Sequence, residues 1–278
     1  MKIGIVGLGL IGGSIAKSIK AKTSHTVYGA DISEETMLLA RMLGSYDAPL
    51  TDENIGDCDI VILALCPETA VDWAEKNAHK IAKEATLADI CGVKRAVFDK
   101  LSATAKENGF YYIGTHPMAG KERGKFQNAT DDLFEGASMI IIPEESTPLG
   151  KVEAFSALCL DIGFARNVFS DCESHDKIIA YTSQLPHIIS NAYIKSPEAQ
   201  FNRGFSAGSF KDLSRVALLD ENMWTELFLD NADYLGEQIE IFAKNLQKYA
   251  DAIKAGDADT LRALLKEGRE LKSTAGGN

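Results

Sequence analysis

The chain lacks the excess of positive charge that proteins carry when they bind nucleic acid through a general electrostatic surface. Its 278 residues include 29 Lys and Arg against 40 Asp and Glu, which gives a formal net charge of −11. This balance argues against a nucleic acid partner, because binding to phosphate backbones depends on basic side chains. An anionic small molecule must therefore be held by individual cations placed at its site.

Cysteine is scarce, and long hydrophobic runs are missing. The five cysteines form no CxxC pair, so we expect no metal and no disulfide framework, but reduced thiols in a cytoplasmic protein. The first residues do not have the pattern of a signal peptide. No apolar run approaches the roughly 20 residues that span a membrane. We therefore expect a soluble protein without a membrane partner.

The overall composition is that of an ordinary globular protein, with 45% hydrophobic and 25% charged residues. A length of 278 residues is typical of two domains. The pattern of the sequence changes near residue 170. We therefore predict one domain over residues 1–170 and a second over residues 171–278.

Short β-rich runs alternate with amphipathic segments in the first of these domains. The expected strands are residues 2–6, 25–30, 59–65, 86–90, 109–114 and 137–142. This alternation predicts an α/β domain with a parallel sheet covered by helices. The run 59–65 is apolar on both faces, as a strand at the centre of such a sheet must be.

Helical periodicity dominates from about residue 173. Apolar residues between Trp224 and Ile253 recur every three or four positions, which predicts one long helix with an extended apolar stripe. A helical domain of about a hundred residues has little core of its own. We therefore expect an all-α second domain that forms a homodimer.

A glycine-rich motif, Gly7-Leu8-Gly9-Leu10-Ile11-Gly12, stands between the first expected strand and a helical stretch. In this setting Gly7 permits a tight turn, Gly9 lets a pyrophosphate approach the backbone, and Gly12 lets the helix pack against the strand. The phosphates would lie at the helix N-terminus. The motif and its context predict a Rossmann-type dinucleotide site.

An acidic residue marks the preferred dinucleotide. Asp31 ends the second expected strand, where a carboxylate accepts hydrogen bonds from the adenosine ribose. It would repel a 2′-phosphate, and the next four residues, Ile32-Ser33-Glu34-Glu35, contain no cation to hold one. NAD is therefore the expected cofactor.

The residues that follow the other strands are candidates for the reacting part of the site, because ligands bind at the carboxyl ends of parallel strands. Cys66, Pro67 and Gly92 occupy such positions and are predicted to line the cofactor. His116 follows the strand 109–114, and its near-neutral pKa suits proton exchange with a hydroxyl. In the helical half, Pro186 precedes His187 in an apolar stretch, where a proline can kink the helix and turn this histidine into a cleft.

Taken together, these segments resemble the prephenate/arogenate dehydrogenase family of tyrosine biosynthesis over nearly the whole chain. The matching stretches are residues 7–14, 89–94, 116–120, 185–187 and 210–215, followed by Trp224. The resemblance implies a Rossmann domain followed by a helical dimerisation domain. It also implies NAD-dependent oxidation of a cyclohexadienol with loss of carbon dioxide as the ring becomes aromatic.

The resemblance also implies roles for individual residues. His116 would take the proton of the ring hydroxyl, and Arg215 would pair with a substrate carboxylate. His187 would hold the substrate side chain and Trp224 would line the pocket. Glu122 and Asp212 would join Arg215 in an ionic network at the mouth of the cleft.

The sequence departs from the family pattern at two positions. Many members have a serine where this chain has Gly92, and one histidine of the segment often written SHLPH is Gln184. Two other functions stay open beside the family activity. One is a dehydrogenase of the β-hydroxyacid type or an imine-forming reductase, which typically relies on a lysine in the helical part. The other is a module that binds NAD without turnover, although such a module would not need His116.

Overall fold

A computed structural model describes residues 1–121 and 124–275. The backbone divides into two compact units, Met1–Asn231 and Ala232–Asn278. All described strands and the helices α1 to α9 belong to the first unit, whereas α10 and α11 belong to the second. The functional boundary expected after residue 170 stays a prediction.

The first unit is built on one eight-stranded sheet. Its strands are β1 Lys2–Val6, β2 Thr26–Ala30, β3 Ala48–Pro49, β4 Ile60–Leu63, β5 Thr86–Asp89, β6 Tyr111–Pro117, β7 Ser138–Pro143 and β8 Arg166–Phe169. They lie in the order β3-β2-β1-β4-β5-β6-β7-β8. The chain turns back at β1, which has β2 on one side and β4 on the other. This is the doubly wound arrangement whose switch point binds ligands, and it confirms the predicted Rossmann-type fold.

The sheet differs from the prediction in three strands. β7 runs antiparallel to β6, because the described residues between them hold only a short 3-10 turn, Phe126–Asn128, and a parallel return needs a longer crossover. β3 and β8 were not predicted. β3 has two residues and includes a proline, and β8 is a largely exposed edge strand without an apolar alternation.

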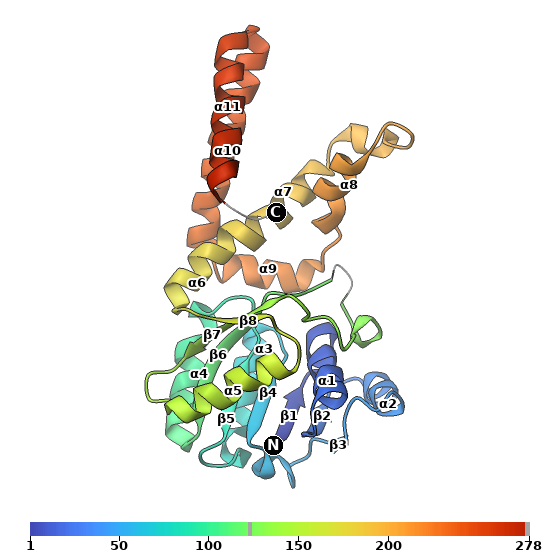
Figure 1. Cartoon of the computed structure of the whole chain (residues 1–278), viewed down its shortest axis with the longest axis vertical. Helices are drawn as coiled ribbons and strands as arrows, with labels where there is room; N and C mark the ends of the chain where they lie inside the picture. The colour runs from blue at the N-terminus through green and yellow to red at the C-terminus, as the bar shows by residue number, and fades with distance from the viewer. Residues whose placement is uncertain (122–123, 276–278) are drawn as a thin grey trace. The chain divides into compact units, whose positions relative to one another are not determined.

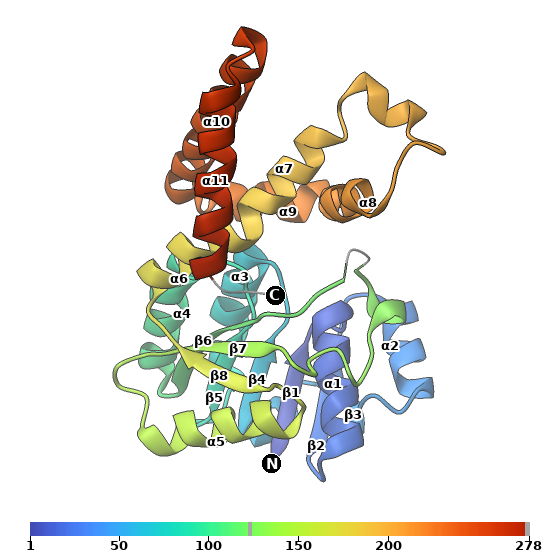
Figure 2. The ribbon, with the colours of Figure 1, turned by 45° about the horizontal axis from the view of Figure 1, so that its top comes forward.

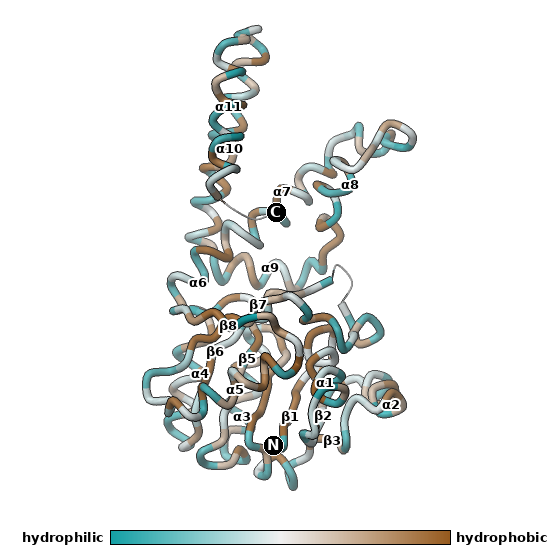
Figure 3. Tube along the Cα trace, in the orientation of Figure 1, coloured by the Kyte–Doolittle hydropathy of each residue, from teal (hydrophilic) through white to brown (hydrophobic). Residues whose placement is uncertain are grey.

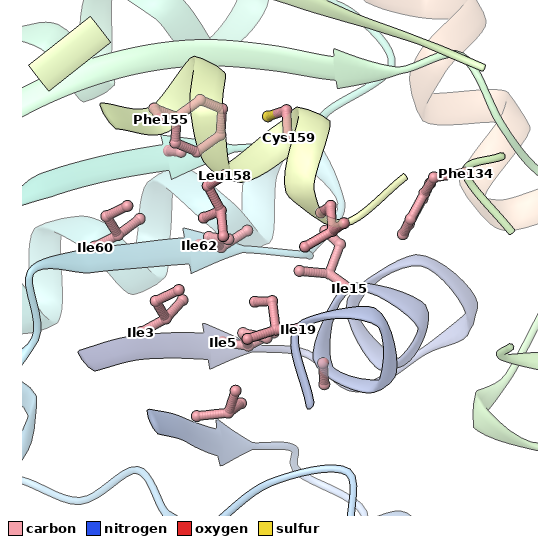
Figure 4. Close-up of a cluster of buried hydrophobic side chains, with 14 of the residues drawn as sticks. Ile3, Ile5, Ile15, Ile19, Ile60, Ile62, Phe134, Phe155, Leu158 and Cys159 are labelled. Atoms are coloured by element: carbon pink, nitrogen blue, oxygen red, sulfur yellow. The ribbon is translucent and has the colours of Figure 1, made fainter. Parts of the chain in front are cut away.

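Helices cover both faces of the sheet (Figures 1 and 2). α1 Leu10–Lys22, α2 Glu34–Met42 and α5 Leu149–Asp161 contribute to one hydrophobic core, and α3 Pro67–Asn77 and α4 Arg95–Asn108 contribute to the other. β4 serves both cores, with Ile60 and Ile62 in the first (Figure 4) and Val61 and Leu63 in the second. The strands of the sheet are largely hydrophobic along the trace (Figure 3), and the place of β4 between β1 and β5 confirms that it is central.

The remaining helices of the first unit are α6 Cys172–Ile179, α7 Leu185–Tyr193, α8 Gly208–Ser214 and α9 Glu221–Leu229. A π-helical turn, Ala180–Gln184, joins α6 to α7. Pro186 stands in the first turn of α7, directly after this π-helical turn. The irregularity expected at this proline is a π-helical turn that precedes it. The last of these helices, α9, lies beyond the strand ends (Figure 1).

The long helix predicted from Trp224 to Ile253 is wrong, since the chain forms α9 and a separate α10 Ala232–Ala255. Asn231, which precedes α10 in the sequence, is fully buried. Its side-chain amide donates to Asp176 O at 2.9 Å and to Gln184 Oε1 at 2.8 Å, and its Oδ1 accepts from Arg95 Nη2 at 3.0 Å. These tertiary hydrogen bonds favour a break that periodicity does not reveal.

The second unit consists of two packed helices, α10 and α11 Ala258–Ala275. Gly256 forms the turn between them with a φ of +66°, a conformation that glycine adopts without strain. The hydroxyl of Tyr249 on α10 donates to Leu264 O on α11 at 3.2 Å. None of the helices described for this chain combines the length and the hydrophobicity that crossing a membrane requires.

Candidate active site

The turn between β1 and α1 can be formed only by glycines at two of its positions. Gly7 has a φ of +90°, and a Cβ there would lie 2.4 Å from Ala64 O. A Cβ on Gly12 would lie 2.0 Å from Gly7 O. These distances are far below any van der Waals contact, so the backbone of the turn and the packing of α1 depend on the missing side chains.

Gly9 is different, because a Cβ there would meet no described atom within 4 Å. The protein itself therefore leaves the space beside Gly9 open. Gly9 is also the N-cap of α1, whose first turn has no side-chain cap and no acidic residue. The first N–H groups of the helix and its positive end are available to an anion, which is what a dinucleotide pyrophosphate requires.

Asp31 is fixed at the end of β2 by two backbone groups. Its Oδ2 accepts from Leu8 N at 2.7 Å, and its Oδ1 accepts from Ser33 N at 2.9 Å. Each carboxylate oxygen still has a lone pair to offer. A carboxylate held beside the glycine turn in this way fits the ribose of NAD.

The loop after β4 contacts α9. Cys66 is the N-cap of α3 and Pro67 is its first residue. Glu226 Oε1 accepts from Glu68 N at 2.7 Å, so a side chain of α9 caps the start of α3. Burial, together with the nearby carboxylates of Glu226 and Asp220, raises the pKa of the Cys66 thiol. Glu226 was not predicted, because nothing in a single sequence pairs residues so far apart.

Gly92, after β5, faces both α9 and the predicted base. A Cβ at Gly92 would lie 3.3 Å from Leu227 Cδ2 and 3.8 Å from His116 Nε2. Residues that are distant in sequence therefore meet at one point beyond the strand ends. A side chain at this position would press against Leu227, so the glycine lets α9 approach the end of β5 closely.

His116 is the penultimate residue of β6 and is half-buried. Burial, and then the neighbouring His175 and Lys94, hold its pKa well below the usual 6.5. The imidazole is therefore neutral at physiological pH. A neutral imidazole can accept a proton from a hydroxyl group, which a cationic one cannot.

His175 and Asp176 of α6 join His116 in a chain of hydrogen bonds that the sequence interpretation missed. His116 Nδ1 lies 2.9 Å from His175 Nε2, and His175 Nδ1 lies 2.7 Å from Asp176 Oδ1. Burial opposes ionisation of Asp176, but hydrogen bonds from His175 and from two backbone N–H groups outweigh it and lower the pKa. The adjacent His175 and Asp176 were the available signal in the sequence.

A buried ion pair lies behind the base. The Lys94 ammonium binds the Asp89 carboxylate, and both side chains are fully buried. Lys94 Nζ also donates to Thr115 O at 2.7 Å, and the hydroxyl of Tyr112 donates to Asp89 Oδ1 at 2.6 Å. This network ties the end of β5 to the end of β6, immediately before His116.

The structure brings together two of the predicted residues of the helical half. The rings of His187 and Trp224 lie 4.0 Å apart between centroids, and His187 Nδ1 donates to Ser183 O at 2.8 Å. Gln184 is buried, and its Nε2 donates to Leu227 O at 2.8 Å. The amide at this departure from the family pattern therefore supports α9 from within the protein.

Three further residues were predicted to bind the substrate. Arg215 is exposed at the start of a short 3-10 turn, Arg215–Ala217, that packs against α7. Asp212 is exposed on α8, and Glu122 lies outside the described residues. The roles of these three side chains stay predictions. Within residues 1–121 and 124–275, no group of three or more His, Cys, Asp or Glu is arranged to hold a metal ion.

A doubly wound sheet with a dinucleotide turn, and a neutral imidazole at its carboxyl edge, defines the class of dinucleotide-dependent dehydrogenases. Two family models specify the class further. One, described as "Prephenate dehydrogenase, nucleotide-binding domain", matches residues 15–167, and one described as "Prephenate dehydrogenase, dimerization domain" matches residues 171–267. The chain belongs to the prephenate dehydrogenase family.

Individual relatives cover nearly the whole chain. A cyclohexadienyl dehydrogenase of Zymomonas mobilis is 30% identical over 97% of this chain and 94% of its own length. A prephenate dehydrogenase of Bacillus subtilis is 28% identical over 96% of this chain and 74% of its own. The crystal structure of prephenate dehydrogenase from A. aeolicus, in complex with hydroxyphenyl propionate and NAD+, matches with a TM-score of 0.86 and 27% identity, over 99% of this chain and 98% of the other.

Proposed function

We propose that the chain is an NAD-dependent dehydrogenase that oxidises and decarboxylates prephenate or arogenate in tyrosine biosynthesis. The observation that carries the proposal is the neutral imidazole of His116 at the carboxyl edge of the sheet, beside Gly92, whose Cβ position lies 3.8 Å from the Nε2 atom of the imidazole. This edge also carries the glycine turn and Asp31. Membership of the prephenate dehydrogenase family supports the same activity.

Bound NAD supplies the acceptor for the hydride that leaves the carbinol carbon of the substrate. The open space at Gly9 and the uncapped start of α1 would receive its pyrophosphate, and Asp31 would bind its ribose. Cys66, Pro67 and Gly92 would line the reacting end of the cofactor. These residues would hold and orient the cofactor.

His116 acts on the ring hydroxyl. Its Nε2 accepts the hydroxyl proton as the carbinol carbon is oxidised, so the O–H bond breaks and an N–H bond forms. Because burial disfavours the cationic imidazole, the histidine is deprotonated and ready before the substrate binds. The ring becomes aromatic as carbon dioxide is lost, which makes the whole reaction strongly downhill.

The helical half would hold the substrate. Arg215 would pair with a carboxylate, for which a planar guanidinium is well suited. His187 and Trp224, whose rings are in contact, would bound the pocket opposite the sheet. Asp212 and Glu122 would complete the ionic groups at its mouth.

A homodimer in the cytoplasm completes the proposal. The matched "dimerization domain" supports it, as does the second unit, whose two helices expose several large apolar side chains, namely Ile241, Phe242, Leu246, Ile253, Leu265 and Leu271. Such surfaces usually bind a partner. Sedimentation of the wild type and of Leu246→Asp should show a dimer and a weakened dimer, respectively. The proposed cytoplasmic location is supported by the five cysteines, which are all free thiols, as a reducing compartment favours.

The deciding experiment measures the appearance of NADH from NAD with prephenate and, separately, with arogenate, with NADP as the control cofactor. Turnover of either acid supports the proposal and identifies the preferred side chain. Saturable binding of NAD without turnover of either acid would contradict it. The β-hydroxyacid activity and the non-catalytic NAD-binding module would then be tested next.

A further inference from the structure

The hydrogen bonds around His116 determine which of its nitrogens carries the proton. Asp176 is ionised, since its pKa is lowered, and a carboxylate only accepts hydrogen bonds. His175 Nδ1, 2.7 Å away, must therefore be the donor to Asp176. In a neutral His175 the other nitrogen, Nε2, is then an acceptor.

The same logic continues to the next ring. Because His175 Nε2 accepts, His116 Nδ1 must donate across the 2.9 Å between them. A neutral His116 with its proton on Nδ1 has its lone pair on Nε2. That nitrogen lies 3.8 Å from the Cβ position of Gly92, and in this scheme it is the one that accepts the proton of the substrate hydroxyl.

Asp176 is held in place by the start of α4. Its Oδ1 accepts from Lys94 N at 2.8 Å, and its Oδ2 accepts from Arg95 N at 2.9 Å and Arg95 Nε at 3.3 Å. It thereby satisfies N–H groups that α4 leaves without a side-chain cap of its own. Asp176 is fully buried, so its orientation is set by the fold before any ligand binds.

We propose that His175, oriented by Asp176, is a positioning residue that holds His116 in the tautomer whose Nε2 can accept the substrate proton. The inference rests on the proposed function in one respect, because it assigns the base. His175 does not touch the substrate in this scheme. It acts only through His116, and it should therefore affect turnover and not affinity.

Two conservative substitutions separate this role from a purely structural one. The amide that His175→Gln introduces reaches about as far as the imidazole Nε2, so its oxygen still accepts from His116 Nδ1, whereas contact with Asp176 is lost. His175→Asn keeps a group near Nδ1 for Asp176 and loses the contact with His116. The proposal predicts that kcat falls less than about fivefold in His175→Gln and roughly 10- to 100-fold in His175→Asn, with KM unchanged in both.

A structural role predicts the opposite order, because the contact of His175 with Asp176 at the start of α4 would then matter most. If His175→Asn is as active as the wild type, or less impaired than His175→Gln, the proposal is wrong. His79→Gln, at an exposed histidine away from the site, serves as the matched control. Thermal unfolding of each variant identifies losses that come from misfolding.

Nitrogen NMR of the imidazole rings tests the tautomer without relying on activity. The chain has five histidines, so the spectrum is simple, and His116→Asn assigns the signal. The proposal predicts a proton on Nδ1 of His116 in the wild type and in His175→Gln, and a shift toward Nε2 protonation in His175→Asn. A wild-type His116 protonated on Nε2 would overturn the inference even if prephenate is turned over. If neither acid is turned over, the proposed function is wrong, and the NMR measurement of the His116 tautomer still tests the present inference.

Discussion

The Cβ position of Gly92 lies 3.8 Å from His116 Nε2, so a side chain at this position would lie beside the nitrogen that is proposed to accept the substrate proton. A methyl group at this position fits if Leu227, 3.3 Å away, moves by a few tenths of an ångström. A branched side chain at this position would crowd both Leu227 and the imidazole of His116. We therefore expect Gly92→Ala to keep kcat/KM within roughly tenfold and Gly92→Val to lower it by at least about 10²-fold, since misplacement at a reacting centre has costs of this size.

Steady-state kinetics on both variants measure this difference, and circular dichroism checks that both are folded. A Gly92→Val enzyme as active as Gly92→Ala would show that the substrate hydroxyl does not bind beside His116. The comparison also bears on Gly92 itself, where many family members have serine. The activity of the two variants shows whether the enzyme tolerates any side chain at position 92.

The depressed pKa of His116 determines the acid side of the pH profile. A base works in its deprotonated form, which predominates above its pKa, and burial holds the pKa of His116 well below 6.5. Activity should therefore persist as the pH falls through 6.5 and should decline only at lower pH. The dependence of kcat/KM on pH measures the midpoint. His116→Asn, which should lose about 10²- to 10⁴-fold in turnover, provides the control, and a midpoint at or above 6.5 would contradict the assigned environment.

Asp31 should discriminate between the two nicotinamide dinucleotides. Removing the carboxylate in Asp31→Ala eliminates charged hydrogen bonds to the ribose, each contributing about 1.5–3 kcal/mol, so NAD affinity should fall at least tenfold. NADP should lose much less, because the charge that repels its phosphate is also removed. Asp31→Asn keeps an oxygen that can accept from Leu8 N and separates the effect of charge from that of the turn. Fluorescence titration of both cofactors gives the four dissociation constants, and equal losses for NAD and NADP in Asp31→Ala would mean that the carboxylate does not bind the ribose.

Arg215 should contribute to substrate affinity and not to chemistry at the ring hydroxyl. Arg215→Gln removes the positive charge and keeps a polar side chain at this exposed position. We expect KM to rise about 10- to 100-fold, because a charge-assisted pair with a carboxylate is lost, whereas kcat changes little. Lys211→Gln, at an exposed neighbour on α8, is the control. An unchanged KM in Arg215→Gln would remove Arg215 from the substrate site.

The Lys94–Asp89 pair should be important for stability. Both side chains are fully buried, and removing one partner leaves an uncompensated charge in the protein interior. Lys94→Met should therefore lower the free energy of unfolding by about 3–5 kcal/mol. Urea denaturation measures the change, with Lys76→Met in the exposed Lys76–Asp72 pair as the control, where little effect is expected. If the two variants are equally stable, the buried pair does not support the end of β6.

The sequence alone predicted the sheet of the first unit well where strands are buried. β1, β2 and β5 combine apolar runs with a glycine motif or a terminal acid, and β4 is apolar on both faces. These local signals reflect local requirements, such as the positive φ of Gly7. The sequence also put His116 just after a strand, and the structure has it as the penultimate residue of β6. The weak edge strands β3 and β8 went unnoticed, because an exposed or two-residue strand has no apolar pattern to recognise.

Only the tertiary structure decided which distant residues surround the base. His175 and Asp176 meet His116 because α6 packs against the start of α4, and Leu227 meets Gly92 because α9 lies over the strand ends. The break at Asn231 has the same origin, since its hydrogen bonds reach Arg95 and Gln184. Periodicity and motifs report local requirements only, namely which side chains of a segment avoid water and which kind of turn follows it. Hydrogen bonds between segments depend on three-dimensional packing, and for this reason the cofactor turn could be recognised from the sequence while the environment of His116 could not.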